Sequence, residues 1–162
     1  MTTLLKSEYR LALEAGAQAL EAALEGLDAR GALRRVLADI YPGEICAVSS
    51  FGAESAVILH LVAEAAPDTP VIFLDTGKLF EETLTYRDAL AGRLGLTNVV
   101  TITPDPNHLA ADDPGGTLHA RNSDLCCHIR KTQPLLRALR PYKVWISCRK
   151  RHHGGDRAAL PR

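Results

Sequence analysis

Short apolar runs alternate with helical patterns along most of this chain. Four runs of four residues have the length and the continuous hydrophobicity of strands that are buried on both faces. They are residues 45–48, 71–74, 99–102 and 144–147. Between the runs, residues 55–65, 81–94 and 124–139 carry apolar side chains at helical spacing. Gly95 should end the second helix, and Pro134 should kink or divide the third. The alternation predicts an α/β fold with a parallel sheet flanked by helices.

Two further helices precede the first strand. Leucines and alanines recur at roughly helical spacing over residues 7–27, with Ser7 as a candidate N-cap. The second helix runs through Leu33 and Ile40 and should end at Pro42-Gly43. We therefore divide the chain into N-terminal helices over residues 1–43 and an α/β region over residues 44–162. The helices should form either an N-terminal layer or a dimer surface.

One segment lacks a clear period. Residues 104–124 are rich in proline, glycine, asparagine and aspartate. A connection of this length without regular structure is uncommon in a domain unless it has a function. We expect a lid or a binding loop here.

Composition excludes several classes of protein. The chain has 162 residues, which suits one domain, and its 19 basic and 19 acidic residues cancel. A net charge of zero argues against bulk binding to nucleic acid, and the short basic cluster at 149–153 better suits a phosphorylated small molecule. No apolar stretch is long enough to span a bilayer, and the N-terminus lacks the pattern of a signal peptide. We expect a cytoplasmic protein that does not bind membranes.

A loop of small residues follows the first strand, from Ser49 to Ser55. Gly52 permits close backbone approach, and the free amides at the start of a helix attract anions. The hydroxyls of Ser49, Ser50 and Ser55 add further hydrogen-bonding groups. The alternative is an ordinary strand-to-helix turn that Ser55 caps. The loop lacks the Gly-Lys-Ser/Thr of a Walker motif.

The second strand ends at Asp75-Thr76-Gly77. An acid at a strand end can accept hydrogen bonds from a ribose or hold a cation. The alternative is a tight turn in which Asp75 caps the following segment.

Two adjacent cysteines, Cys126 and Cys127, lie beside Arg130 and Lys131. Neighbouring cysteines at the start of a helix bond to each other with difficulty, but both can ligate one metal cluster. The cations would favour thiolates and offset their charge. The alternative is two small apolar residues in a helix. An iron–sulfur or zinc site with four thiolates needs four ligands, and the remaining cysteines are Cys46, which we expect in the core, and Cys148.

In combination these motifs resemble the sulfonucleotide reductases, the adenylylsulfate and phosphoadenylylsulfate reductases of sulfate assimilation. The matching segments are Ser50–Ser55, Asp75–Phe80 with Glu82-Thr83 and Tyr86-Arg87, Cys126–Lys131, and Arg149–Arg151 with Gly154-Gly155. The resemblance covers most of residues 45–161. The adjacent cysteines are similar to those of the branch that carries a cluster and prefers adenylylsulfate.

The resemblance implies a fold like that of the adenine nucleotide α-hydrolases. It implies that Ser49, Ser50, Phe51, Gly52 and Ser55 form the nucleotide loop, that Leu74 and Asp75 flank the adenosine, and that Lys131 and Arg149 face the phosphosulfate. Cys126 and Cys127 would be two ligands of a 4Fe-4S cluster. In the family a C-terminal thiolate attacks the sulfur and releases AMP, and thioredoxin or a similar reductant then releases sulfite.

Two departures from the family pattern shape the expectations. The second cysteine pair and the C-terminal nucleophile segment of the family are absent from the 162 residues. We therefore expect a reductase truncated at its C-terminal side, with no catalytic cysteine before Arg162 and an incomplete cluster site. Cys148 also replaces a glycine that is typical of the family. The alternatives are an inactive adenine-nucleotide-binding module, a phosphoadenylylsulfate reductase, or an adenylating transferase. A homo-oligomer is also compatible with the sequence.

Overall fold

Four parallel strands form a single sheet in the order β3-β2-β1-β4. They are β1 (Ile45–Val48), β2 (Val71–Leu74), β3 (Val99–Ile102) and β4 (Val144–Ser147). The structure is a computed structural model that describes residues 3–147, with side chains from residue 10 onward. The parallel sheet and all four predicted strands are confirmed. Cys148, Arg149 and the basic cluster at 149–153 lie outside the described residues.

The register of the sheet follows from burial of its central strands on both faces. Ala47 of β1 lies opposite Val71 of β2 on one side and Ile146 of β4 on the other. Residues 45–47 and 71–73 are all buried, which explains why these runs are apolar without alternation. The chain builds β1, β2 and β3 outward in one direction and then returns to add β4 on the other side of β1.

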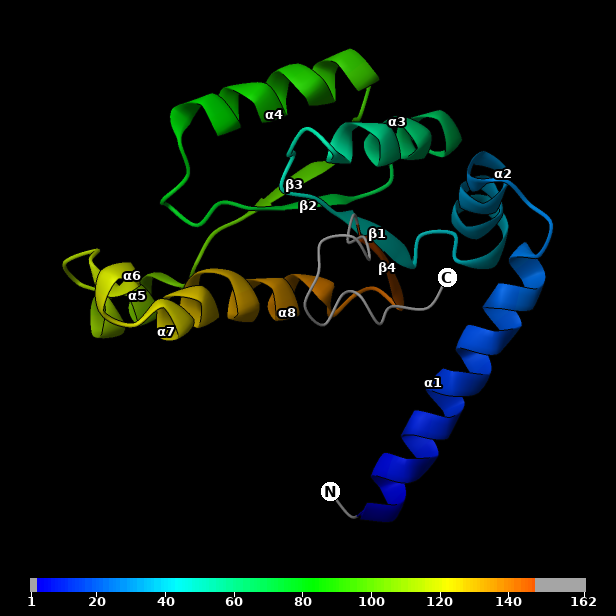
Figure 1. Cartoon of the computed structure of the whole chain (residues 1–162), viewed down its shortest axis with the longest axis horizontal. Coiled ribbons are helices and arrows are strands. Elements are labelled where there is room, and N and C mark those ends of the chain that lie inside the picture. The colour runs from blue at the N-terminus through cyan, green and yellow to red at the C-terminus, as the bar shows by residue number, and fades with distance from the viewer. Residues whose placement is uncertain (1–2, 148–162) are drawn as a thin grey trace.

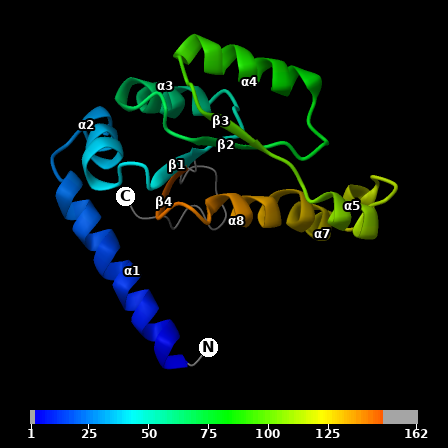
Figure 2. The same ribbon diagram turned by 180° about the vertical axis from the view of Figure 1, so that it is seen from behind.

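Helices cover both faces of the sheet (Figure 1). Helices α3 (Ser55–Ala65) and α4 (Glu81–Leu94) lie on one face, and α8 (Gln133–Leu139) lies on the other. The view from behind shows the same layers (Figure 2). The main core lies between the sheet and the first pair of helices. Its buried members are Ala47, Phe51, Leu59, Val71, Phe73, Leu90 and Leu96.

The N-terminal helices are α1 (Thr3–Leu24), α2 (Ala29–Arg34) and the π-helix η1 (Arg35–Ile40). The prediction for α1 was wrong at both ends. The helix begins four residues before Ser7, which therefore is not its N-cap, and Gly26, with φ of +76°, follows its end. Val36 and Leu37 of η1 pack with Ile45 and Val62 in a second core cluster, while α1 extends away from the sheet (Figure 1). No described helix is long and apolar enough to cross a membrane.

The expectation of an irregular loop over residues 104–124 was also wrong. The segment contains α5 (Pro106–Asp112) and α6 (Leu118–Arg121), and α7 (Ser123–Cys127) follows. Local caps define these short helices, because the carboxylate of Asp105 accepts from the Asn107 amide at 2.8 Å and that of Asp113 from the Leu118 amide at 2.8 Å.

The third predicted helix is divided, as Pro134 suggested. Helix α7 continues into the π-helix η2 (His128–Thr132), and α8 begins at Gln133 with Pro134 in its first turn. The continuous run of α7, η2 and α8 places Cys127 and Lys131 in one cavity with the last residues of β1, β2 and β4.

Candidate nucleotide-binding site

A cavity of about 700 Å³ opens at the carboxyl ends of three strands. Val48, Leu74 and Ser147 are the last residues of β1, β2 and β4, and all three line it. Because β4 lies on the opposite side of β1 from β2, the cavity occupies the point where the strand order reverses. Ligands of open parallel sheets bind at such points. The other lining residues are Ser49, Ser50, Gly52, Ala53, Glu54, Ser55, Cys127, Lys131, Thr132, Leu135, Leu136 and Trp145.

The loop between β1 and α3 forms one wall of this cavity, called here the nucleotide cavity. Two of its amides are used internally, because Phe51 donates to the Ser49 hydroxyl at 3.0 Å and Ser55 donates to the Gly52 carbonyl at 2.8 Å. Within the part of the chain that the structure describes, no hydrogen bond uses the amides of Ser50, Gly52 or Ala53. Unused amides beside a helix start are suited to an anion.

Phe51 gives the loop its shape without lining the cavity. Its φ is +55°, a left-handed conformation that a bulky residue seldom adopts, and its ring is 1 % exposed. The ring packs edge-on against Phe73 of β2, with centroids 5.7 Å apart. The guanidinium of Arg87 lies over the Phe73 ring, 4.9 Å from its centroid. Core packing therefore offsets the backbone strain and fixes the loop above the sheet.

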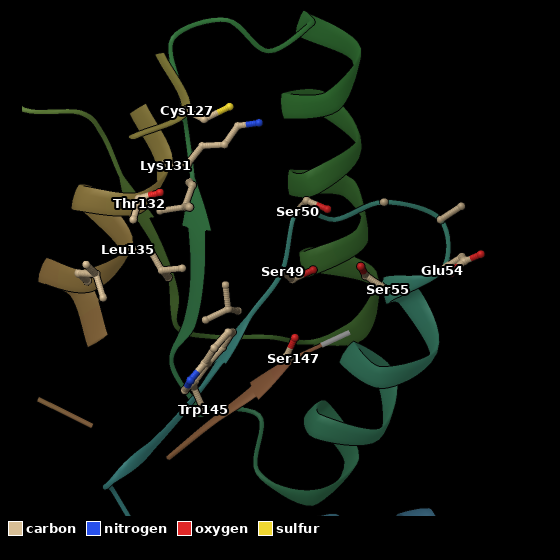
Figure 3. A pocket seen from close by; sticks show the side chains of 15 residues that line it. Ser49, Ser50, Glu54, Ser55, Cys127, Lys131, Thr132, Leu135, Trp145 and Ser147 are labelled. Atoms are coloured by element: carbon tan, nitrogen blue, oxygen red, sulfur yellow. The ribbon is translucent and has the colours of Figure 1, made fainter. Parts of the chain in front are cut away.

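The opposite wall comes from the end of α7 together with η2 and α8. Cys127, Lys131 and Leu135 succeed one another at intervals of four residues, so they share one helix face. Figure 3 shows Lys131 and Cys127 at one end of the cavity, Trp145 at the other, and the hydroxyls of Ser49 and Ser50 between them. Lys131 is exposed and has no ion-pair partner among the described residues. The cavity thus has a cationic end and an apolar end.

A second cavity of about 380 Å³ adjoins the first. Cys127 and Lys131 line both, so they form the boundary between the two. The second cavity is also lined by Thr76, Lys78, Leu79, His119, Ser123, Cys126 and Arg130. Its wall therefore combines two thiols with three cationic side chains.

Arg130 differs from the role that the sequence suggested. Although Arg130 lines the second cavity with both thiols, its guanidinium binds Asp113, with 2.6 Å between Nη2 and Oδ2, and donates to the Thr76 carbonyl at 2.7 Å. The hydrogen bond from Arg130 holds the pKa of Asp113 below its ordinary value in spite of burial. The charge of Arg130 is thus balanced within the protein, which leaves Lys131 and Lys78 as the cations beside the thiols.

Asp75 does not line either cavity. Its carboxylate accepts a hydrogen bond from the Gly77 amide at 2.9 Å, which closes a turn after β2. Gly77 has φ of +66°, a conformation that suits glycine. The tight-turn interpretation describes this contact, while Leu74, the residue before it, does line the nucleotide cavity.

The two adjacent cysteines have the donor chemistry of an iron–sulfur site. Cys126 is 8 % exposed, Cys127 is exposed, and both line the second cavity. Among residues 10–147, no three cysteine, histidine or acidic side chains come together as a metal-binding group. Cys46 is fully buried in β1, where burial raises the pKa of its thiol to about 11. The described residues therefore fit two of the four positions of a 4Fe-4S site.

The structure brings most of the predicted nucleotide residues together. Seven predicted site residues line the nucleotide cavity, namely Ser49, Ser50, Gly52, Ser55, Leu74, Cys127 and Lys131. Sequence reasoning missed Thr132, Leu135, Trp145 and Ser147. The helical spacing from Cys127 could have found Leu135, and the end of the fourth apolar run could have found Ser147. No pattern in the sequence marks Trp145.

Comparison with protein families decides the relationship. Residues 44–162 match the phosphoadenosine phosphosulfate reductase domain. The chain belongs to this family. The matched residues include β1, the loop after it, both cysteines and all of the described cavity wall.

The curated relatives of this chain include proteins named adenosine 5'-phosphosulfate reductase and proteins named phosphoadenosine 5'-phosphosulfate reductase. An adenosine 5'-phosphosulfate reductase of Mesorhizobium japonicum is 50% identical over 147 residues, which cover 91% of this chain and 57% of the relative. One from a Chelativorans species is 54% identical over 119 residues, covering 74% and 49%. A phosphoadenosine 5'-phosphosulfate reductase of Gloeobacter violaceus is 37% identical over 114 residues, covering 69% and 47%. The chain thus spans about half the length of these relatives.

A solved structure shares the fold. The phosphoadenylyl-sulfate reductase of Candida auris, in a phosphate complex, has a TM-score of 0.68 and 22% identity, and the match covers 89% of this chain and 69% of that one. The similarity confirms the predicted architecture of the adenine nucleotide α-hydrolase type.

Proposed function

We propose that this chain is the nucleotide-binding part of an assimilatory adenosine 5'-phosphosulfate reductase. The observation that carries the proposal is the nucleotide cavity, in which unused loop amides and the ammonium of Lys131 meet at the switch point of the sheet. Membership of the phosphoadenosine phosphosulfate reductase family supports a sulfonucleotide as the substrate. In this proposal the substrate is adenylylsulfate, the products are sulfite and AMP, and thioredoxin or a similar reductant supplies the electrons. The cytoplasm, where thiols stay reduced, is the proposed location.

The two ends of the cavity suggest how the nucleotide lies. Leu74, Leu135 and Trp145 provide apolar and aromatic surface for an adenine ring. The 5' phosphosulfate would point to the other end, toward Lys131 and the amides of Ser50 and Gly52. Oriented donors at a phosphosulfate stabilise the charge that develops on the leaving phosphate when sulfur is attacked. In this arrangement the chain binds and orients the substrate, and Arg149 would add a further cation.

Adenylylsulfate is the preferred substrate in this proposal. Relatives named adenosine 5'-phosphosulfate reductases match at 38%, 50% and 54% identity, while those of the phosphoadenosine type match at 37% and 38%. Cys126 and Cys127 would hold two positions of a 4Fe-4S cluster, which would add a charged group beside the phosphosulfate when bound.

Binding and reduction can be tested separately. The 162-residue chain should bind AMP and adenylylsulfate at one site, and each should displace the other in a calorimetric titration. Binding without sulfite release also fits the alternative of an inactive nucleotide-binding module. We propose that the four cysteines of this chain do not include the nucleophile. Cys126 and Cys127 have cluster roles by resemblance, and Cys46 is buried. Cys148 replaces a glycine of the family that we expect at the body of the nucleotide and not at its sulfate end.

The assay is therefore sulfite release from labelled adenylylsulfate with reduced thioredoxin. The expected yield for this chain does not exceed the control without enzyme. Sulfite release that disappears in the Cys148→Ser variant would make Cys148 the nucleophile and would contradict that part of the proposal. A wild-type chain that binds neither AMP nor adenylylsulfate would contradict the proposed function itself.

A further inference from the structure

A buried ion pair joins three segments that are distant in sequence. Arg130 of η2 binds Asp113, which follows α5, and the two side chains are 7 % and 0 % exposed. The other terminal nitrogen of Arg130 donates to the Thr76 carbonyl, in the loop after β2, at 2.7 Å. The second carboxylate oxygen of Asp113 accepts from the Leu118 amide at 2.8 Å. One planar guanidinium thus fastens a helix, a turn and a strand-end loop together.

The position of this pair connects it to both cavities. Arg130 precedes Lys131 and follows Cys127 by three residues, or about one helical turn, and both of these residues line the two cavities. Thr76, the other partner of Arg130, also lines the second cavity. The ion pair therefore joins the wall of the second cavity, through Arg130, to a buried carboxylate that lines neither cavity.

The hydrogen bonds of Arg130 show that it acts within the protein. Both terminal nitrogens have protein acceptors, and the inner nitrogen Nε is buried without a partner among the described residues. A cation that served mainly as a ligand contact would keep a terminal nitrogen toward the cavity. Buried ion pairs contribute little net stability relative to apolar packing, and their best-supported use is to specify one geometry.

We propose that Asp113 is a positioning residue for the wall between the two cavities. Its carboxylate holds Arg130 against the loop after β2 and thereby fixes residues 126–131 relative to the sheet. The consequence is that Cys126 stays covered and that Lys131 is held at the nucleotide cavity. The part of this inference that concerns the nucleotide rests on the proposed function, whereas the part that concerns Cys126 does not.

The first test measures the labelling rate of each cysteine in the folded chain by mass spectrometry. Asp113→Asn preserves size and removes the charge that binds Arg130. The expected result is a rise of about tenfold in the labelling of Cys126, because local opening exposes it, with less than a twofold change at Cys46 in the core. Arg130→Lys should have the same effect, because one ammonium group cannot replace both directions of the guanidinium fork.

Asp88→Asn is the matched control, because Asp88, whose side chain is 69 % exposed, binds Arg87 at 2.8 Å and neither residue lines the two cavities. It should leave both rates unchanged. Equal increases at Cys126 and Cys46 in the Asp113 variant would indicate general loss of stability and would overturn the positioning role. No increase at Cys126 in either Asp113→Asn or Arg130→Lys would overturn it as well.

The second test separates positioning from folding by a difference between two ligands. In Asp113→Asn, the Kd for AMP should rise about fivefold, while the Kd for adenosine, which lacks the phosphate, should stay within twofold. Equal weakening of both ligands, or no weakening of AMP, would contradict the role at Lys131. If the wild-type chain binds no AMP, the proposed function fails, and the labelling of Cys126 still decides whether Asp113 fixes the wall.

Discussion

Replacing Phe51 with alanine should both destabilise the protein and weaken nucleotide binding, although the ring does not line the cavity. The side chain is 1 % exposed and packs on Phe73 with centroids 5.7 Å apart. A buried aromatic side chain removes about 150–250 Å² from water, and at about 25 cal/mol per Å² this is worth roughly 4–6 kcal/mol. Alanine retains the Cβ and the strained backbone, so the expected loss in unfolding free energy is about 3–5 kcal/mol.

The assay is urea unfolding of the 162-residue chain followed by circular dichroism. For a domain of this size, that loss corresponds to a decrease of roughly 10 °C in Tm. Phe51→Leu should lose less, because it keeps most of the buried apolar volume. Val57, a residue of α3 that is 69 % exposed, supplies the control, and Val57→Ala should change the unfolding free energy by less than about 0.5 kcal/mol.

Phe51→Ala should also weaken AMP binding, because the ring holds the loop between β1 and α3 in place. Without the ring, the amides of Ser50 and Gly52 lose the packing that holds them above β1, so the Kd for AMP should rise at temperatures where the variant is still folded. An unfolding free energy within about 1 kcal/mol of the wild type would refute the view that this ring anchors the loop. Unchanged AMP affinity in a clearly destabilised variant would show that the loop keeps its shape without it.

Two further predictions concern single groups. Gly52→Ala should leave Tm unchanged, because a Cβ there would lie 3.7 Å from the Ser50 hydroxyl, which is an ordinary contact distance. It should weaken AMP binding, because the Cβ would keep the phosphate away from the backbone of the loop. Equal affinity of the variant and the wild type for AMP would contradict a close approach of the phosphate to Gly52. Burial raises the pKa of the Cys46 thiol to about 11. The thiol should therefore ionise at lower pH in the unfolded chain, so the unfolding free energy should fall between about pH 9 and 11. In denaturant titrations Cys46→Ala should make this fall with pH shallower, and the same dependence on pH as in the wild type would refute the raised pKa of Cys46.

The apolar pattern was sufficient to predict the sheet. Strands buried on both faces need continuous apolar runs, so β1 and β2 have sequences that few other structures would tolerate, and their ends fix where ligands bind. The segment from residue 104 to 124 was mispredicted because its helices are short and depend on individual caps at Asp105 and Asp113. Such helices have too few turns to show a hydrophobic period.

The site was predictable where motifs coincide with strand or helix ends. The strand-to-helix turn predicts that loop residues such as Ser50 line the site. The four-residue spacing of Cys127 and Lys131 predicts that both lie on one helix face, which forms the boundary between the two cavities. The pairing of Arg130 with Asp113 was not predictable, because it joins residues whose proximity depends on three separate turns. A sequence with several cations near two thiols does not indicate which cation is already paired with an acidic side chain of the protein.

The most direct test of the account is a calorimetric titration of AMP into the wild-type chain and the Lys131→Met variant at low salt. At an effective dielectric between that of a protein surface and water, a cation about 4 Å from a phosphate contributes roughly 1–4 kcal/mol. Since Lys131 is exposed, the lower part of that range applies, and we predict saturable binding with one site and a Kd about tenfold higher in the variant. Lys143→Met, which removes an exposed lysine paired with Glu44, should bind AMP like the wild type. No heat with millimolar AMP, or equal affinities for wild type and Lys131→Met, would contradict the assignment of this cavity to an adenine nucleotide.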